Sequence, residues 1–138
     1  MPYSVLLAWL LTAGAGALAL LAWLRRRRPT SRFPTRLVVS HIGTAAAVLA
    51  LWVIFLPTDA AGWAWAAFGV LNVTNGLGDA ILTGRFRRMT AIRSTWWRDY
   101  RRAVVAVLRG RRPPAPTLHA LAAGVTYFGT LAACLIAT

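Results

Sequence analysis

Long apolar runs separated by short polar stretches dominate this chain. Four of the runs are long enough to cross the hydrocarbon core of a membrane, which is about 30 Å thick and takes roughly 20 helical residues. They cover residues 5–24, 37–56, 60–83 and 118–137. Lipid offers no partner to a free backbone amide, and the sequence lacks the alternating pattern of barrel strands, so we predict helices. The expected fold is an all-α bundle of four transmembrane helices that forms a single membrane domain over residues 1–138.

The segment between the third and fourth runs has a different pattern. Over residues 86–110, apolar side chains recur at steps of three and four, and most arginines lie between them. This period predicts a basic amphipathic helix that lies in the membrane interface. The candidate residues for contact with anionic lipid or a partner protein are Trp96, Trp97, Arg98, Arg101 and Arg102. The alternative is that this helix covers one end of the bundle and binds nothing.

Composition agrees with a membrane protein. The chain is 58% apolar and only 14% charged, whereas a soluble domain has about a quarter of its residues charged. Disordered segments lack apolar and aromatic residues, but this chain has seven tryptophans. The composition therefore argues against a water-soluble globule and excludes a disordered tail.

The positions of the basic residues predict the topology. All 16 are arginine, with six in residues 25–36 and ten in residues 85–112, which four spans place on one side of the membrane. The positive-inside rule makes that side cytoplasmic and puts both termini outside. The absence of lysine and the heavy use of alanine and glycine are typical of a high-GC bacterial genome, so we expect a multi-pass protein of the bacterial plasma (inner) membrane. Anionic lipids are the expected partners of the arginines, and the net charge of +13 requires no nucleic acid.

Three ionisable side chains interrupt the predicted spans near their arginine-bearing ends. With a helical rise of 1.5 Å per residue, His41 and Asp79 lie about 8–9 Å inside the nearest arginine, and His119 is close to the start of the fourth span. An ionisable group in hydrocarbon costs about 2.5 kcal/mol or more and usually faces a partner in the bundle interior. We therefore predict that His41, Asp79 and His119 converge, with Asn75 and Tyr127 close by.

Two interpretations of this cluster follow from its chemistry. In the first, a hydrogen bond between Asp79 and a histidine joins the helices and nothing binds. In the second, Asp79 and the histidines move protons or a small cation, or hold a metal ion, as in a small transporter.

A third interpretation comes from a resemblance. The second and fourth spans are expected to be diagonal partners in the bundle, each with one histidine at equal depth. This arrangement resembles one haem layer of the membrane cytochromes b. The resemblance implies that His41 and His119 are the axial ligands of a single b-type haem, with Gly16, Gly76 and Gly78 leaving room for the macrocycle. Asp79 is not part of that pattern.

The chemistry that the sequence lacks narrows the function. It contains no lysine, glutamate or glutamine, no glycine-rich phosphate loop and no nucleophile elbow, and its lone cysteine, Cys134, is near the end of the fourth span. We expect no catalytic residues. The leading expectation is a small non-enzymatic membrane protein, either an accessory subunit or a homo-oligomer, since the small residues of the first span favour close contact with another helix.

Overall fold

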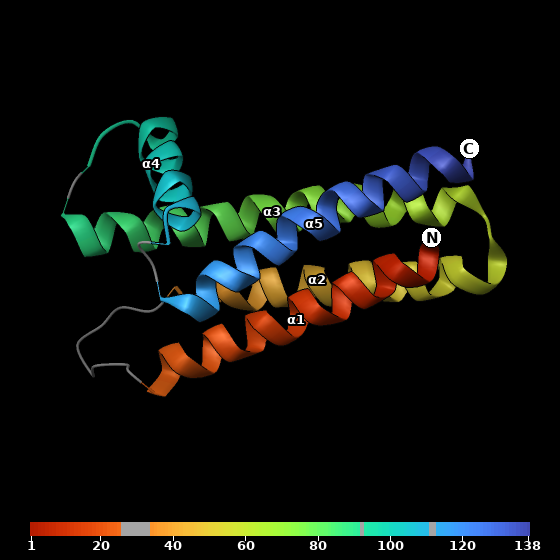
Figure 1. Ribbon diagram of the computed structural model, residues 1–138, viewed down its shortest axis with the longest axis horizontal. Coiled ribbons are helices and arrows are strands. Elements are labelled where there is room, and N and C mark those ends of the chain that lie inside the picture. The colour runs from red at the N-terminus through yellow and green to blue at the C-terminus, as the bar shows by residue number, and fades with distance from the viewer. Residues whose placement is uncertain (26–33, 92, 111–112) are drawn as a thin grey trace.

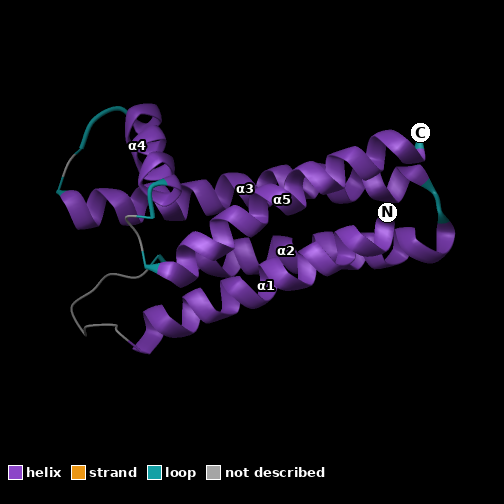
Figure 2. Cartoon of the chain, in the orientation of Figure 1, coloured by secondary structure: helices purple, strands orange, loops and turns teal. Residues whose placement is uncertain are grey.

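The computed structural model describes residues 1–25, 34–91, 93–110 and 113–138. These residues form five helices and no strand (Figures 1 and 2). The helices are α1 (Pro2–Arg25), α2 (Thr35–Thr58), α3 (Ala61–Thr90), α4 (Trp96–Leu108) and α5 (Pro114–Ala137). The all-helical fold predicted from the sequence is confirmed for this part of the chain.

Three of the described helices are long and apolar enough to cross a membrane, namely α1, α2 and α5. They correspond to the first, second and fourth predicted spans and extend each of them by a few residues. With 30 residues α3 is longer than any of them, but it does not meet the same criterion. Polar side chains such as Asn72, Asn75 and Asp79 lower its hydropathy. The predicted third span over residues 60–83 therefore stays a prediction.

The amphipathic helix predicted over residues 86–110 is wrong in its first half. Residues 86–90 continue α3, the left-handed residue Ala91 (φ 55°) ends that helix, and α4 begins only at Trp96. The chain is folded back by Asp99, whose carboxylate accepts hydrogen bonds from the backbone N–H of Ser94 (3.0 Å) and from Arg87 Nε on α3 (2.7 Å). The helical spacing of apolar residues continues from the end of α3 into α4, because the apolar side chains of both helices face each other. The spacing alone therefore does not reveal the break between them.

The four long helices lie side by side, and α4 lies steeply inclined to them at one end, against α3 and α5 (Figure 1). The closest partners are α2 with α3 and α1 with α5. Both termini and the turn between α2 and α3 are at the opposite end from α4. Neither α1 and α3 nor α2 and α5 pack closely on each other, so each of these pairs is diagonal in the bundle.

Packing differs between the two ends of the bundle. Near the termini, Trp52 and Phe55 of α2 are fully buried, and the Trp52 indole donates to the carbonyl of Pro2 (3.2 Å). Toward α4, no described residue of α1 after Thr12, of α2 before Val48 or of α5 before Thr126 is buried. Figure 1 shows α1 diverging from α3 toward this end. The loosely packed half of the bundle is the half that contains both histidines.

Candidate histidine site and cationic pocket

His41 on α2 and His119 on α5 meet across the bundle. Their ring centroids are 6.0 Å apart, and the ring planes are nearly perpendicular, at 88°. Since α2 and α5 are diagonal helices that do not pack on each other, the two imidazoles reach toward one another from opposite sides of the interior. The structure thus brings together two of the three ionisable residues that the sequence predicted to converge.

Both imidazoles are held by the same kind of hydrogen bond. His41 Nδ1 lies 3.0 Å from the carbonyl oxygen of Thr74 on α3, and His119 Nδ1 lies 2.9 Å from the carbonyl oxygen of Thr12 on α1. A carbonyl can only accept, so each Nδ1 must have the proton and donate it. In a neutral imidazole the other nitrogen then has a free lone pair. Each Nε2 is therefore an acceptor or a ligand, and no described residue donates a hydrogen bond to either one.

Glycines on α1 and α3 allow the imidazoles to come this close. A Cβ atom at Gly16 would lie 2.9 Å from Cε1 and 3.0 Å from Nδ1 of His119, and one at Gly78 would lie 3.2 Å from Cε1 of His41. Each glycine stands four residues after the threonine whose carbonyl accepts the bond. The sequence-based hypothesis gave these glycines to a macrocycle, but in the structure Gly16 and Gly78 contact the imidazoles. Gly76 has no such neighbour within 4 Å.

Asp79 points to α4 rather than to the histidines. Its carboxylate accepts a hydrogen bond from the Tyr100 hydroxyl. The reason is the helical rotation of 100° per residue, which separates Asp79 from Gly78, the residue that faces His41. The hydrogen bond between Asp79 and a histidine predicted by the structural interpretation is therefore absent among the described contacts. No three described His, Cys, Asp or Glu side chains are placed to hold a metal ion.

Of the remaining predicted neighbours, Asn75 lies on the polar face of α3 and Tyr127 on α5 contacts that face. Tyr127 donates to Asn72 Oδ1 (3.0 Å) and lies two helical turns, about 12 Å along α5, from His119. Asn75 lies between Asn72 and Asp79 on that face. This polar face is thus directed at tyrosines of α4 and α5, and the structure does not bring Tyr127 to the histidine pair.

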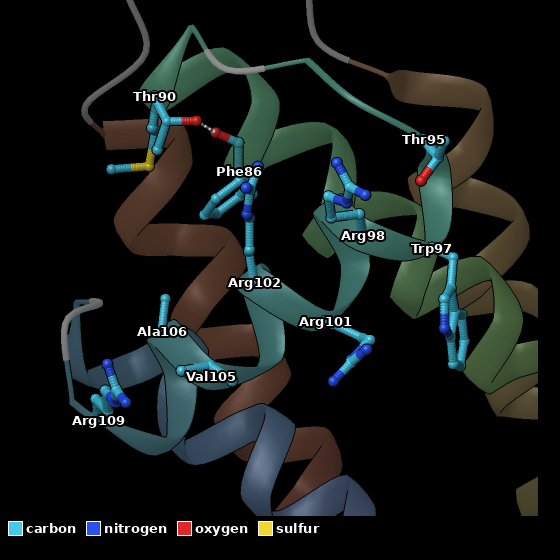
Figure 3. A pocket seen from close by; sticks show the side chains of 11 residues that line it. Phe86, Thr90, Thr95, Trp97, Arg98, Arg101, Arg102, Val105, Ala106 and Arg109 are labelled. Atoms are coloured by element: carbon cyan, nitrogen blue, oxygen red, sulfur yellow. Dashed lines mark hydrogen bonds between the residues drawn. The ribbon is translucent and has the colours of Figure 1, made fainter.

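A second candidate site is a pocket between α4 and the last turns of α3 (Figure 3). Its volume is about 850 Å³. The lining combines apolar side chains with arginines and includes Phe86, Met89, Trp97, Val105, Arg98, Arg101, Arg102 and Arg109. Four of the five predicted lipid- or partner-binding residues line it. The fifth, Trp96, stacks instead on Tyr100, with ring centroids 5.3 Å apart and planes at 5°.

The pocket has an excess of positive charge. Asp99 is fully buried and forms the ion pairs found among the described residues, with Arg87 at 2.7 Å and with Arg102 at 4.0 Å. No described carboxylate pairs with Arg98, Arg101 or Arg109, so these three guanidinium groups have no internal counter-charge.

Comparisons with protein-family models, with curated proteins and with solved structures find no match to this chain. The chemistry of the two sites is therefore the basis for assigning a function.

Sequence reasoning missed the residues that hold the histidines. Thr12 and Thr74 act through their backbone carbonyls, which every residue has, so their side chains gave no signal. Each threonine does begin the same short pattern, Thr-x-Gly-x-Gly, at residues 12–16 and 74–78. That repeated pattern was visible in the sequence, and it could have directed attention to both carbonyls.

Proposed function

We propose that this chain is a small membrane protein that binds one b-type haem between His41 and His119 and carries electrons as a non-enzymatic subunit of a larger assembly or of a homo-oligomer. The observation that supports this is the pair of imidazoles that meet across the bundle, both with Nδ1 bonded to a carbonyl and neither with a donor to Nε2 among the described residues. A metal-bound histidine commonly donates its other ring N–H to a carbonyl or carboxylate, which fixes the ring orientation. A haem bound here would supply one-electron chemistry, and His41 and His119 would be the residues that hold it.

The spacing of the two rings fits a shared iron. Two histidines that hold one metal ion would each bring a ring nitrogen to about 2.0–2.1 Å from it, with the ion between the two rings. The ring centroids of His41 and His119 are 6.0 Å apart.

The rest of the site favours haem over a bare metal ion. An ion held by two histidines alone would lack further protein ligands, since no described carboxylate or thiolate joins the pair. A porphyrin brings its own four nitrogens. The macrocycle also needs a part of the bundle without a packed core, and the half that contains the histidines has no buried residue on α1, α2 or α5.

In this proposal α1, α2, α3 and α5 all cross a bacterial plasma membrane, with both termini outside and the arginine-rich end in the cytoplasm. The inclusion of α3 is supported by its packing against α2 and α5 and by the pairing of its polar side chains with Tyr127 and Tyr100. Polar groups in a span that are turned to protein partners avoid most of the cost of facing lipid. The exposed leucines of α1 and α5 are suited to lipid or to another subunit.

The test is the visible spectrum of the purified protein in detergent, oxidised and reduced with dithionite. A Soret band that shifts on reduction and disappears in His41→Ala and in His119→Ala is the expected result. Asp79→Asn is the matched control, because Asp79 contacts Tyr100 rather than the histidines, and its spectrum should be unchanged. Circular dichroism confirms that each variant is folded. A folded protein that stays colourless when produced with ample haem refutes the proposal.

We also propose that the pocket between α3 and α4 binds the headgroup of an anionic phospholipid. Three arginines without an internal counter-charge offer donors to a phosphate, and Phe86, Met89 and Val105 offer apolar contact to the start of an acyl chain. Native mass spectrometry of the protein released from mixed vesicles should find anionic lipid retained over zwitterionic lipid. Arg98→Ala with Arg101→Ala should abolish that preference, and an unchanged preference would contradict the assignment.

A further inference from the structure

The two histidines are held by copies of one local arrangement. On α1, the Thr12 hydroxyl donates to the carbonyl four residues earlier (Ala8, 2.8 Å), its own carbonyl accepts from His119, and Gly16 follows four residues later. On α3, the Thr74 hydroxyl donates to the carbonyl of Val70 (3.1 Å), its carbonyl accepts from His41, and Gly78 follows at the same spacing. The same residue types make the same contacts in both places.

The match extends to the buried positions of the first and third helices. On α1 the buried residues are Val5, Trp9 and Thr12. Adding 62 to each residue number gives Ala67, Leu71 and Thr74, which are all buried on α3. The same offset takes Gly16 to Gly78. The additional buried residues of α3 include Phe86, which lines the pocket with α4.

The second and fifth helices match in the same way. On α2 the buried residues are Val48, Trp52 and Phe55, and an offset of 78 gives Thr126, Thr130 and Ala133, which are buried on α5. This offset also takes His41 to His119. The second offset exceeds the first by 16 residues, because the segment between α3 and α5, which includes α4, is longer than the nine residues between α1 and α2.

The packing has the symmetry that these offsets require. A half-turn about an axis along the bundle would exchange α1 with α3 and α2 with α5. It would therefore exchange the pair α1–α5 with the pair α3–α2, and these are the two most closely packed pairs. Repeats related by an axis along the membrane normal are a common way to build a membrane site at the repeat interface.

We infer that the chain is a duplicated helical hairpin, that its site consists of two equivalent half-sites facing each other across the axis, and that Gly16 and Gly78 are positioning residues for the imidazoles. A ligand on such an axis must offer two equivalent positions on opposite sides, as the two axial positions of haem iron do. The identity of that ligand rests on the proposed function, but the half-sites do not.

The glycines provide the test, with controls in the same two motifs. Gly16→Ala puts a Cβ 2.9 Å from the His119 ring and must displace it from the Thr12 carbonyl. Gly78→Ala puts a Cβ 3.2 Å from the His41 ring and displaces it less. Gly14→Ala and Gly76→Ala make the same chemical change two residues earlier, where the added Cβ meets nothing within 4 Å apart from the adjacent residues and the helix's own backbone. All four variants gain the same helix propensity, so a difference between the pairs reports the contact with histidine.

The measurement is the nitrogen NMR spectrum of histidine-labelled full-length protein at alkaline pH without haem. Both imidazoles should have the proton on Nδ1. Gly16→Ala should shift the His119 signals, Gly78→Ala should shift the His41 signals by a smaller amount, and the two controls should shift neither. A proton on Nε2 in either ring, or equal shifts in Gly14→Ala and Gly16→Ala, overturns the half-sites.

This result is separable from the haem proposal. If the tautomers and the glycine effects are as expected in a protein that stays colourless with ample haem, the half-sites stand and the haem assignment fails. In a coloured protein, Gly16→Ala should change the Soret spectrum or reduce haem retention and Gly14→Ala should not. A haem spectrum that is equally insensitive to both overturns the positioning role and leaves the haem assignment in place.

Discussion

The buried hydroxyl pair between α1 and α5 allows a quantitative test of the packing above the histidine site. The Oγ1 atoms of Thr12 and Thr126 are 2.8 Å apart, and the two residues are only 6% and 1% exposed. Thr12 already donates its one proton to the carbonyl of Ala8. Thr126 must therefore be the donor in the interhelical bond. Thr126→Val removes that donor and keeps the branched shape of the side chain, and Thr12→Val removes the acceptor.

The expected coupling energy follows from the location of the bond. Interhelical side-chain hydrogen bonds in membrane proteins average about 0.6 kcal/mol in double-mutant cycles and reach about 1.7 kcal/mol. Because this pair is short and fully enclosed, we expect a coupling between these two values, which corresponds to a change of about 3-fold to 18-fold in the unfolding constant. The assay is the equilibrium titration of the protein from mild detergent into SDS, followed by tryptophan fluorescence, for the parent, both single variants and the double variant.

A control cycle makes the result decisive. The Thr44 hydroxyl bonds to the carbonyls of Ser40 and His41 on its own helix, so Thr44→Val combined with Thr126→Val should give no coupling. A coupling for Thr12 and Thr126 that is no larger than this control value would refute the interhelical bond and the proton assignment.

Three further predictions concern the equivalent position on α2 and the attachment of α4. Val48 occupies the place on α2 that Thr126 occupies on α5, so the hydroxyl of Val48→Thr should bond with Thr74. The substitution should change the free energy of unfolding by less than about 0.5 kcal/mol in the same SDS titration. A loss of several times that value contradicts the duplication. The Ser94 backbone N–H, the Ser94 hydroxyl and Arg87 lower the pKa of Asp99 from 3.8 to about 2. The contribution of Asp99 to α4 docking should therefore be complete above about pH 4 and be lost as the pH falls through about 2. Arg87→Gln should move that loss to higher pH, as measured by amide hydrogen exchange in α4. Burial, together with the charge and hydrogen bond of Asp79, raises the pKa of Tyr100, so Asp79→Asn should lower it in an NMR titration of the Tyr100 ring, and no change would place Asp79 elsewhere.

Hydrophobic periodicity was sufficient for the helices but not for the ends of α3 and α4. The apolar runs in α1, α2 and α5 depend on local chemistry alone, and they were found with errors of a few residues. The break at Ala91 depends on Asp99, which binds Arg87 twelve residues earlier in the chain and Ser94 five residues earlier. Such a bond forms only when the chain folds back, so the amphipathic pattern of residues 86–110 could not predict it.

The histidine pair was predictable because polar side chains at the same level of long apolar helices are best accommodated where they face each other in the bundle interior. The position of Asp79 was not, since depth does not determine which way a side chain points around the helix axis. Gly78 and Asp79 are consecutive residues at the same depth, yet one faces His41 and the other faces Tyr100 on α4. Depth along the bundle can be read from the sequence, whereas the rotation of α3 is set by its packing against α2, α4 and α5.

The duplication explains why the site has two histidines and one carboxylate that does not join them. Under the offset between α1 and α3, the counterpart of Asp79 is Ala17, and the nine residues between α1 and α2 are fewer than the 13 residues of α4. Asp79 therefore belongs to the part of α3 that differs between the repeats, and its partner Tyr100 is on the inserted helix. The histidines, the threonine carbonyls and the two close glycines belong to the part that is shared. A residue required by a ligand on the axis must occur in both hairpins, and on this criterion the ligand site comprises the two half-sites, while Asp79 serves to attach α4.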